Sequence, residues 1–208
     1  MDFEVRRDDL RATRVVDAPP PSPQDGEALL ALDHAALTSN NVTYGAFGSI
    51  MRYWDFFPAP DGWGRIPVWG FADVAASRAP GIEEGERVYG YFPMSTHLVV
   101  SPVRLAERTF VDGAAHRAEL PPVYNQYSRV VRRPKEYEHQ YGVLRPLFTT
   151  SFLIDDWLAE SAFFGAAAVV IGSASSKTAI ALAESLSARG GVEVIGLTSE
   201  RNREFVER

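Results

Sequence analysis

The sequence predicts an α/β protein (α+β overall) in which a β-barrel or β-sandwich precedes a βαβ unit. Three observations predict this order. Short β-like runs broken by Pro, Gly and Asp fill residues 1 to about 110. From about residue 145 the apolar residues recur at helical spacing. A strand, a helix and a second strand then follow within roughly 30 residues, the usual size of a βαβ unit.

The β-rich part is marked by four runs separated by turn-forming stretches such as PPPSPQDGE and APDGWG. Their spacing is typical of a compact barrel or sandwich. The following segment, 111–142, is polar and rich in Tyr and Pro, and we expect it to be a loop that crosses the surface. The four runs are EALLALDHAAL, IPVWGFADVAASRA, ERVYGYFPM and THLVVSP.

The helical part begins with LRPLFTTSFLIDDWLAESAFF, whose apolar residues predict one buried helix face. Next, AAAVVIG and VEVIGLTS are apolar runs of the kind that is buried on both faces of a parallel sheet. Between them TAIALAESLSA predicts a helix that a Gly-Gly pair ends. The predicted helix face consists of Leu147, Phe148, Phe152, Leu153, Trp157 and Leu158.

The polar stretch GSASSKT lies between the first of these strands and the helix, where free N–H groups and the helix dipole favour an anion. Its sequence matches neither of the two best-known phosphate-loop motifs. Ser176 stands where a P-loop has its second Gly, and only Gly172 is present of the three glycines in a Rossmann fingerprint. An alternative interpretation is that Ser173 or Ser175 only caps a structural helix. The candidate phosphate-binding residues are Gly172, Ser173, Ser175, Ser176, Lys177 and Thr178.

Composition excludes several classes of protein. A formal charge of −6 without a basic block argues against nucleic acid as a partner. The sequence has no apolar run of the ~18 residues that a membrane span needs and no signal-peptide core, so we expect no membrane association and a cytoplasmic location. Cys is absent and the four His residues lie far apart, so we expect no metal site. Those residues are His34, His97, His116 and His139.

Two stretches of the β-rich part carry a family resemblance. Residues 26–44 (GEALLALDHAALTSNNVTY) and 66–102 resemble the medium-chain dehydrogenase/reductase superfamily, in its zinc-free quinone and enoyl reductase branch. In the second stretch Gly70, Gly85, Val88 and Pro102 stand at matching places, and Glu86 replaces the usual Asp.

The resemblance implies a GroES-like substrate and catalytic domain at 1–145 and the start of a Rossmann dinucleotide-binding domain at 146–208. A doubly wound domain needs more strands than two, so we expect a fragment that binds NADPH poorly by itself and has no turnover. We expect its exposed sheet edge to be covered by self-association, as a homo-oligomer, or by a partner chain. Where the family usually has a Gly-Gly-x-Gly loop, this sequence has Ser175, Ser176, Lys177 and Thr178.

The resemblance also implies an NADPH-dependent, metal-independent reductase of an activated C=C bond or a quinone. Tyr44 resembles a family Tyr that faces the nicotinamide, and Asn40 and Asn41 would orient the substrate or the nicotinamide. Tyr53, Trp54 and Phe57 would form the apolar wall, although aromatic clusters more often fill a core. Tyr124 is a second-tier candidate. An alternative is a catalytically silent relative that binds a ligand or a partner.

The end of the second strand, GLTSERN, indicates which cofactor binds. An NAD site usually has an acid here for the ribose 2′-hydroxyl. The hydroxyls of Thr198 and Ser199 together with Arg201 suit a 2′-phosphate, whereas Glu200 would repel it if it pointed inward. We therefore expect NADP(H), with a solvated turn as the alternative interpretation.

Overall fold

The computed structural model describes residues 1–17 and 19–208. It divides into two compact units, unit 1 at Met1–Gly142 and unit 2 at Val143–Arg208. The boundary predicted from the sequence, after residue 145, lies three residues later.

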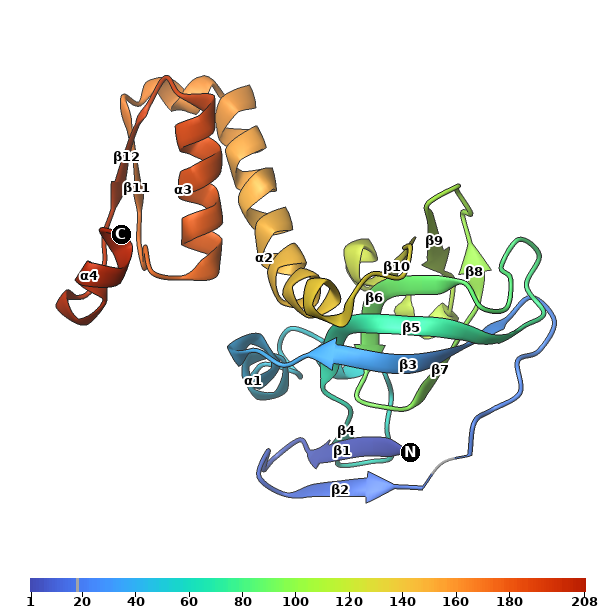
Figure 1. The fold of residues 1–208 in the computed structure, drawn as a ribbon. Coiled ribbons are helices and arrows are strands. Elements are labelled where there is room, and N and C mark those ends of the chain that lie inside the picture. Colours follow the sequence, from blue (N-terminus) through green and yellow to red (C-terminus); the bar gives the residue numbers. More distant parts are fainter. Residues whose placement is uncertain (18) are drawn as a thin grey trace. The chain divides into compact units, whose positions relative to one another are not determined.

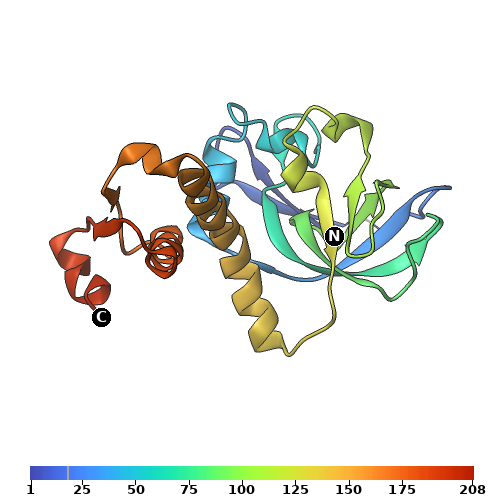
Figure 2. The same cartoon turned by 90° about the horizontal axis from the view of Figure 1, so that it is seen from above.

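Unit 1 is built on a seven-stranded antiparallel sheet of order β7-β3-β5-β6-β10-β9-β8, which curls on itself (Figures 1 and 2). A smaller sheet of order β2-β1-β4 adjoins the N-terminus. The bounds are β1 (Asp2–Arg6), β2 (Thr13–Val16), β3 (Ala28–Ala36), β4 (Trp63–Gly64), β5 (Pro67–Ser77), β6 (Arg87–Pro93), β7 (His97–Val100), β8 (Pro102–Val103), β9 (Thr109–Asp112) and β10 (Gln126–Arg129). The helices are α1 (Ser39–Ala46), η1 (Tyr53–Asp55), η2 (Ala115–Arg117) and η3 (Pro122–Asn125).

Strands β3, β5, β6 and β7 lie within the four predicted runs. One glycine allows close packing of two of these strands, and another forms a turn. A Cβ on Gly70 would lie 2.4 Å from the carbonyl oxygen of His34 on the neighbouring strand. Gly85 has a φ of +86° in the turn before β6, a backbone conformation that L side chains avoid. The barrel core consists of Ala28, Leu30, Val68, Ala72, Val74, Ala79, Ile82, Val88, Phe92, Val100, Phe110 and Tyr127.

The prediction of a loop over 111–142 is wrong. Strand β10 lies inside the sheet, where Ser128 pairs with Tyr89 of β6 and Tyr127 pairs with Phe110 of β9. The Tyr127 hydroxyl donates to the carbonyl oxygen of Tyr91 at 2.9 Å. A strand of four residues with one buried aromatic side chain has too little alternation to be recognised from sequence.

Helix α2 (Lys135–Glu160) begins directly after Pro134, nine residues before the predicted helix. Acidic residues in its first turn, Glu136 and Glu138, suit a helix N-terminus. Its polar first turns lack the apolar repeat on which the prediction depended. Among the described residues, none forms a helix both long and apolar enough to cross a bilayer.

Unit 2 contains the predicted βαβ unit, visible in Figure 1 as β11, α3 and β12. Strands β11 (Ala168–Ile171) and β12 (Glu193–Gly196) pair in parallel, and α3 (Lys177–Arg189) joins them and ends at Gly190. The Asp155 carboxylate of α2 pairs with Arg189 of α3 at 2.6 Å. The remaining elements are η4 (Ala162–Gly165), η5 (Glu200–Asn202) and α4 (Arg203–Val206).

Two burial predictions for unit 2 are wrong. The strands are not buried on both faces, because Val170 of β11 is 58% and Ile195 of β12 is 37% exposed. The predicted face of α2 is also more than half exposed at Phe148, Phe152 and Trp157. The side of α2 that packs in unit 2 carries the buried Ser151 and Asp155 and the half-buried Ile154 and Leu158, of which only Leu158 belongs to the predicted face. Polar residues on this side broke the apolar pattern, so sequence alone favoured the wrong face.

Candidate functional site

Helix α1 places Tyr44, and its N-terminus is fixed by a capping box. The Thr38 hydroxyl accepts from the N–H of Asn40 at 3.3 Å, and the Asn41 side-chain oxygen accepts from the N–H of Thr38 at 2.7 Å. The Asn41 amide also donates to the carbonyl oxygen of Pro67 at 2.8 Å, which ties α1 to β5. Asn41 therefore has a structural role, whereas Asn40 is half-exposed at the start of α1.

Tyr44 lies in an aromatic cluster with two of its three predicted neighbours. Its ring centroid is 4.6 Å from that of Tyr53, and Phe57 packs in the same cluster. Trp54 is buried elsewhere, against Gly48 and Gly64. The other members of this Tyr44 cluster are Phe56, Tyr91 and Leu120, with Ile66, Trp69, Leu98 and the second-tier candidate Tyr124 packed against them.

Burial controls the protonation of the phenols in the Tyr44 cluster. It raises the pKa of Tyr44 above its ordinary value, and it raises the pKa of Tyr91 and of Tyr124 as well. These hydroxyls keep their protons at neutral pH. Tyr44 is therefore a hydrogen-bond donor, the state that is needed to stabilise a negative oxygen in a reaction.

The loop between β11 and α3 contains the predicted phosphate-binding residues. Ser176 is the N-cap of α3, and its hydroxyl accepts from the N–H of Ala179 at 3.2 Å, so the alternative that named Ser173 or Ser175 as the cap is wrong. Ser173 has a φ of +51°, the left-handed conformation that favours glycine. Gly172 precedes it, and Lys177 and Thr178 open the helix, where the first N–H groups have no partner within the helix.

The end of β12 lies beside this loop. The Asn202 side chain donates to the Ser175 hydroxyl at 3.0 Å and so joins η5 to the loop. The Thr198 hydroxyl oxygen is buried without a hydrogen-bond partner in the described part of the chain. Ser199 precedes η5, and Arg201 within it is exposed. The two parts of the predicted NADP(H) site therefore lie together in unit 2, with hydroxyls and exposed cations that fit phosphate oxygens.

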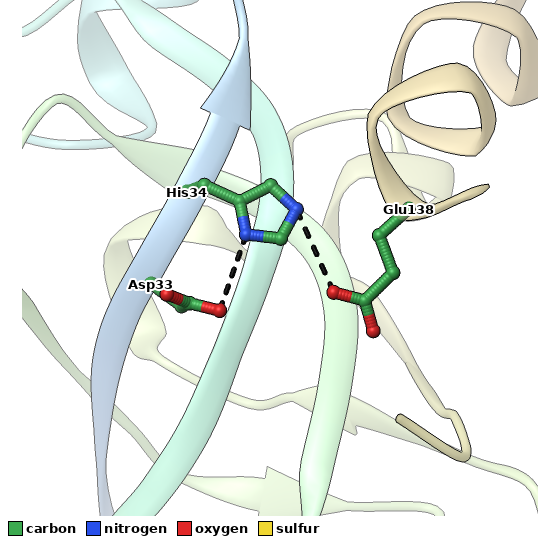
Figure 3. A group of neighbouring side chains, drawn as sticks. All are labelled: Asp33, His34 and Glu138. Carbon is green, nitrogen blue, oxygen red and sulfur yellow. Dashed lines mark hydrogen bonds and ion pairs between the residues drawn. The ribbon is translucent and has the colours of Figure 1, made fainter. Parts of the chain in front are cut away.

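One polar cluster was missed by sequence reasoning. His34 lies between two carboxylates (Figure 3), with Nδ1 3.2 Å from Asp33 and Nε2 3.7 Å from Glu138. The ring of His139 is 5.1 Å from that of His34. Two of the four histidines thus meet, although they lie 105 positions apart, and no spacing in the sequence signals the contact.

The buried side chain of Arg87 holds this cluster together. Its guanidinium donates to Glu138 at 2.6 Å, to Asp33 at 2.7 Å and to Asp73 at 2.9 Å. Hydrogen bonds from Arg87 lower the pKa of Asp33 and of Glu138. Burial alone would lower the pKa of Arg87, but its hydrogen bonds to Glu138, Asp33 and Asp73 outweigh burial and raise it. Asp33, His34 and Glu138 lie close enough together to hold a cation, yet the guanidinium of Arg87 already donates to both carboxylates.

Solved structures with the same fold are quinone and enoyl reductases of the medium-chain dehydrogenase/reductase superfamily, in which a GroES-like domain precedes a Rossmann domain. A human synaptic vesicle membrane protein VAT-1 homolog-like protein matches with a TM-score of 0.54 and 16% identity over 100% of this chain and 59% of its own. The quinone oxidoreductase from Coxiella burnetii matches with a TM-score of 0.54 and 14% identity over 99% and 58%. A mycobacterial protein complexed with NADPH matches with a TM-score of 0.53 and 16% identity over 99% and 54%.

This chain spans little more than half the length of those solved structures. It belongs to the family DUF2855, described as a protein of unknown function, whose model matches residues 35–208. No curated protein matches the chain.

Proposed function

We propose that the full-length protein is an NADPH-dependent, metal-independent oxidoreductase that reduces an activated C=C bond or a quinone. The observation that carries the proposal is the joined loop and strand end of unit 2. This region contains the N-terminus of α3, the exposed cations Lys177 and Arg201, and the hydroxyl of Thr198, which has no hydrogen-bond partner among the described residues. Solved relatives of the same fold, titled as a quinone oxidoreductase, as an enoyl reductase and as a complex with NADPH, support it.

In this proposal the residues of unit 2 bind the adenosine half of the cofactor. The N–H groups at the start of α3 and the ammonium of Lys177 hold the pyrophosphate, and Arg201 with Thr198 holds the 2′-phosphate. NADPH supplies the hydride. Ser173, Ser175 and Ser176 are the small residues that let the backbone approach the phosphates.

The residues of unit 1 act on the substrate in this proposal. The protonated hydroxyl of Tyr44 donates to the oxygen that gains negative charge as the double bond or quinone is reduced. Tyr53 and Phe57 exclude water from that oxygen, which strengthens the hydrogen bond. Asn40 orients the substrate. None of these roles needs a metal, since a phenol is the electrophilic group.

Arg201→Ala tests this assignment in the full-length protein. Loss of a charge-assisted contact to phosphate costs about 1.5–3 kcal/mol, so NADPH affinity is expected to fall by about tenfold or more while NADH affinity barely changes. Nicotinamide fluorescence follows both titrations. Arg203→Ala is the matched control, because Arg203 is an exposed cation two residues away that pairs with Glu207. Equal weakening of both cofactors would show that Arg201 does not contact the 2′-phosphate.

A catalytically silent relative is the second candidate. Ser176 caps α3, and the Asn41 side-chain oxygen accepts from the N–H of Thr38 and so caps α1, so two predicted site residues have structural roles here. Cofactor binding without turnover on quinones and enones would favour this candidate.

We also propose a homo-oligomer. The exposed apolar side chains Val170 and Ile195 on the β11–β12 sheet support self-association. Light scattering that gives a monomer mass at all concentrations would contradict it.

A further inference from the structure

The outer face of α1, which follows the end of β3 in unit 1 (Figure 1), is apolar although it is exposed. The inner face of this helix carries the buried Asn41, Tyr44 and Gly45. The outer face and the turns on either side of it carry five large apolar side chains that are 51% to 79% exposed. The residues of this α1 patch are Leu37, Val42, Phe47, Ile50 and Met51.

The members of the α1 patch follow one helical path. Leu37 and Val42 stand at the N′ and N4 positions of α1, whose side chains commonly contact each other as a hydrophobic staple. The N–H of Met51 donates to the carbonyl oxygen of Phe47 at 2.8 Å, which continues the helical path beyond the end of α1. Ile50 follows Val42 by eight residues, a spacing that returns to the same side of a helix. The five side chains therefore form one surface.

The α1 patch carries no charge. Residues 37–51 contain no acidic or basic side chain, in a chain of which 23% is charged. The exposed polar side chains of this stretch are the hydroxyls of Ser39, Thr43 and Ser49, which suit the polar rim of an interface. A charged partner would find no opposite charge here. Two copies of a chain of net charge −6 repel each other, but at the α1 patch they can meet without bringing like charges together.

The area of the α1 patch fits a dimer contact. Full burial of one large apolar side chain removes roughly 60–120 Å² from water. At the exposed fractions of its five residues, the α1 patch therefore offers on the order of 300 Å² of apolar surface. A standard interface buries about 800 Å² on each partner, a little over half of it apolar, so the patch supplies about two thirds of that apolar area.

We propose that the α1 patch binds the α1 patch of a second copy of this chain about a twofold axis. A twofold contact uses the same face of both copies, so each patch covers the other. The hydroxyls of the rim remain in contact with water. This contact belongs to unit 1 and is distinct from the β11–β12 sheet of unit 2.

Ile50→Asp tests the contact by sedimentation equilibrium. Ile50 is 79% exposed, so a single copy tolerates the change, whereas the dimer would bring two carboxylates into an apolar interface. The dimer Kd is expected to rise by about a hundredfold or more. Val131→Asp is the matched control, because Val131 is 77% exposed in the segment before α2, and it should leave the Kd unchanged. Thermal unfolding confirms that both variants are folded. A monomeric wild type, or an Ile50→Asp protein as dimeric as the wild type, would overturn the proposal.

A single cysteine at the same position distinguishes a second copy from any other cover of the α1 patch. The sequence contains no Cys, so Ile50→Cys and Val131→Cys each introduce one thiol. Labelling of Ile50→Cys is expected to slow as the protein concentration rises through the dimer Kd, while Val131→Cys is labelled at a constant rate. A constant rate at Ile50→Cys would contradict the proposal: a fast one means that the patch stays open, and a slow one that it is covered within one copy. Neither measurement uses NADPH, so both are independent of the proposed reductase function.

Discussion

Ser173 is a non-glycine residue in the left-handed region, at the point where β11 leads into the loop before α3. For an L residue that conformation costs roughly 1–2 kcal/mol. Replacement by glycine removes this cost, but glycine has more conformational freedom in the unfolded chain, which offsets part of the gain in stability. Ser173→Gly is therefore expected to raise the free energy of unfolding by about 0.5–1 kcal/mol. Urea denaturation measures the change.

The control for this prediction is Ser187→Gly within α3, where the backbone is helical. Glycine in a helix interior lowers stability, and we expect a loss of about 0.5 kcal/mol. If Ser173→Gly destabilised the protein as Ser187→Gly does, Ser173 would not be strained.

Sequence reasoning at the residue scale located the loop but not the role of each residue in it. Ser173, Ser175 and Ser176 are equally good N-cap residues, and only the backbone path shows that Ser176 caps α3 while Ser175 binds Asn202. The contacts of Arg87 were beyond reach for another reason. Its partners Asp33 and Glu138 lie 54 and 51 positions away, and only the fold brings them together.

Elements β3, β5 and β6 and the N-terminal end of α2 meet at Arg87. Replacing it by Met leaves the carboxylate of Glu138, a side chain only 3% exposed, without its partner. Removal of one partner of a buried ion pair typically costs about 3–5 kcal/mol, and we expect a loss of that size from Arg87→Met in urea denaturation. Arg78→Met is the control, because the ion pair of Arg78 with Asp25 is exposed and should contribute about 0–1 kcal/mol. A loss below 1 kcal/mol from Arg87→Met would contradict the view that this cluster stabilises the fold.

The same cluster predicts a dependence on acid. The pKa values of Asp33 and Glu138 are lower in the folded protein than the ordinary 3.8 and 4.5. Their contribution to stability is complete above those ordinary values and is lost as pH falls through the lowered ones. Carboxyl groups ordinarily titrate between about pH 5 and pH 2. Over this range the wild-type protein should lose more stability than Arg87→Met. Parallel acid curves would show that Arg87 does not lower these pKa values.

At the scale of elements, the strands with regular alternation or long apolar runs were predictable, as was α3 with its Gly190 stop. Strand β10 and the first turns of α2 were not, because four mixed residues and a polar helix start carry no periodic signal. Burial of β11 and β12 was overestimated, since an apolar run predicts what a strand can bury and not what covers it.

The whole molecule should be sensitive to alkali. Burial raises the pKa of Tyr127 to about 12, and burial also raises the pKa of Tyr44, Tyr91 and Tyr124 above the ordinary value of 10.0. Well below pH 10.0 these phenols are protonated in both the folded and the unfolded state, and stability does not depend on them. As pH rises further, they ionise first in the unfolded chain, so stability falls. Unfolding midpoints measured from about pH 8 to 12 should drop, and Tyr91→Phe should drop less steeply.

The central claim for the molecule is that unit 2 is the opening of an NADP(H)-binding domain. Equilibrium titration of the full-length protein with NADPH and NADH tests it most directly. NADPH is expected to bind at least tenfold more tightly than NADH, because one charge-assisted contact to the 2′-phosphate contributes about that factor. Equal affinity for the two cofactors, or binding of neither, would contradict the account.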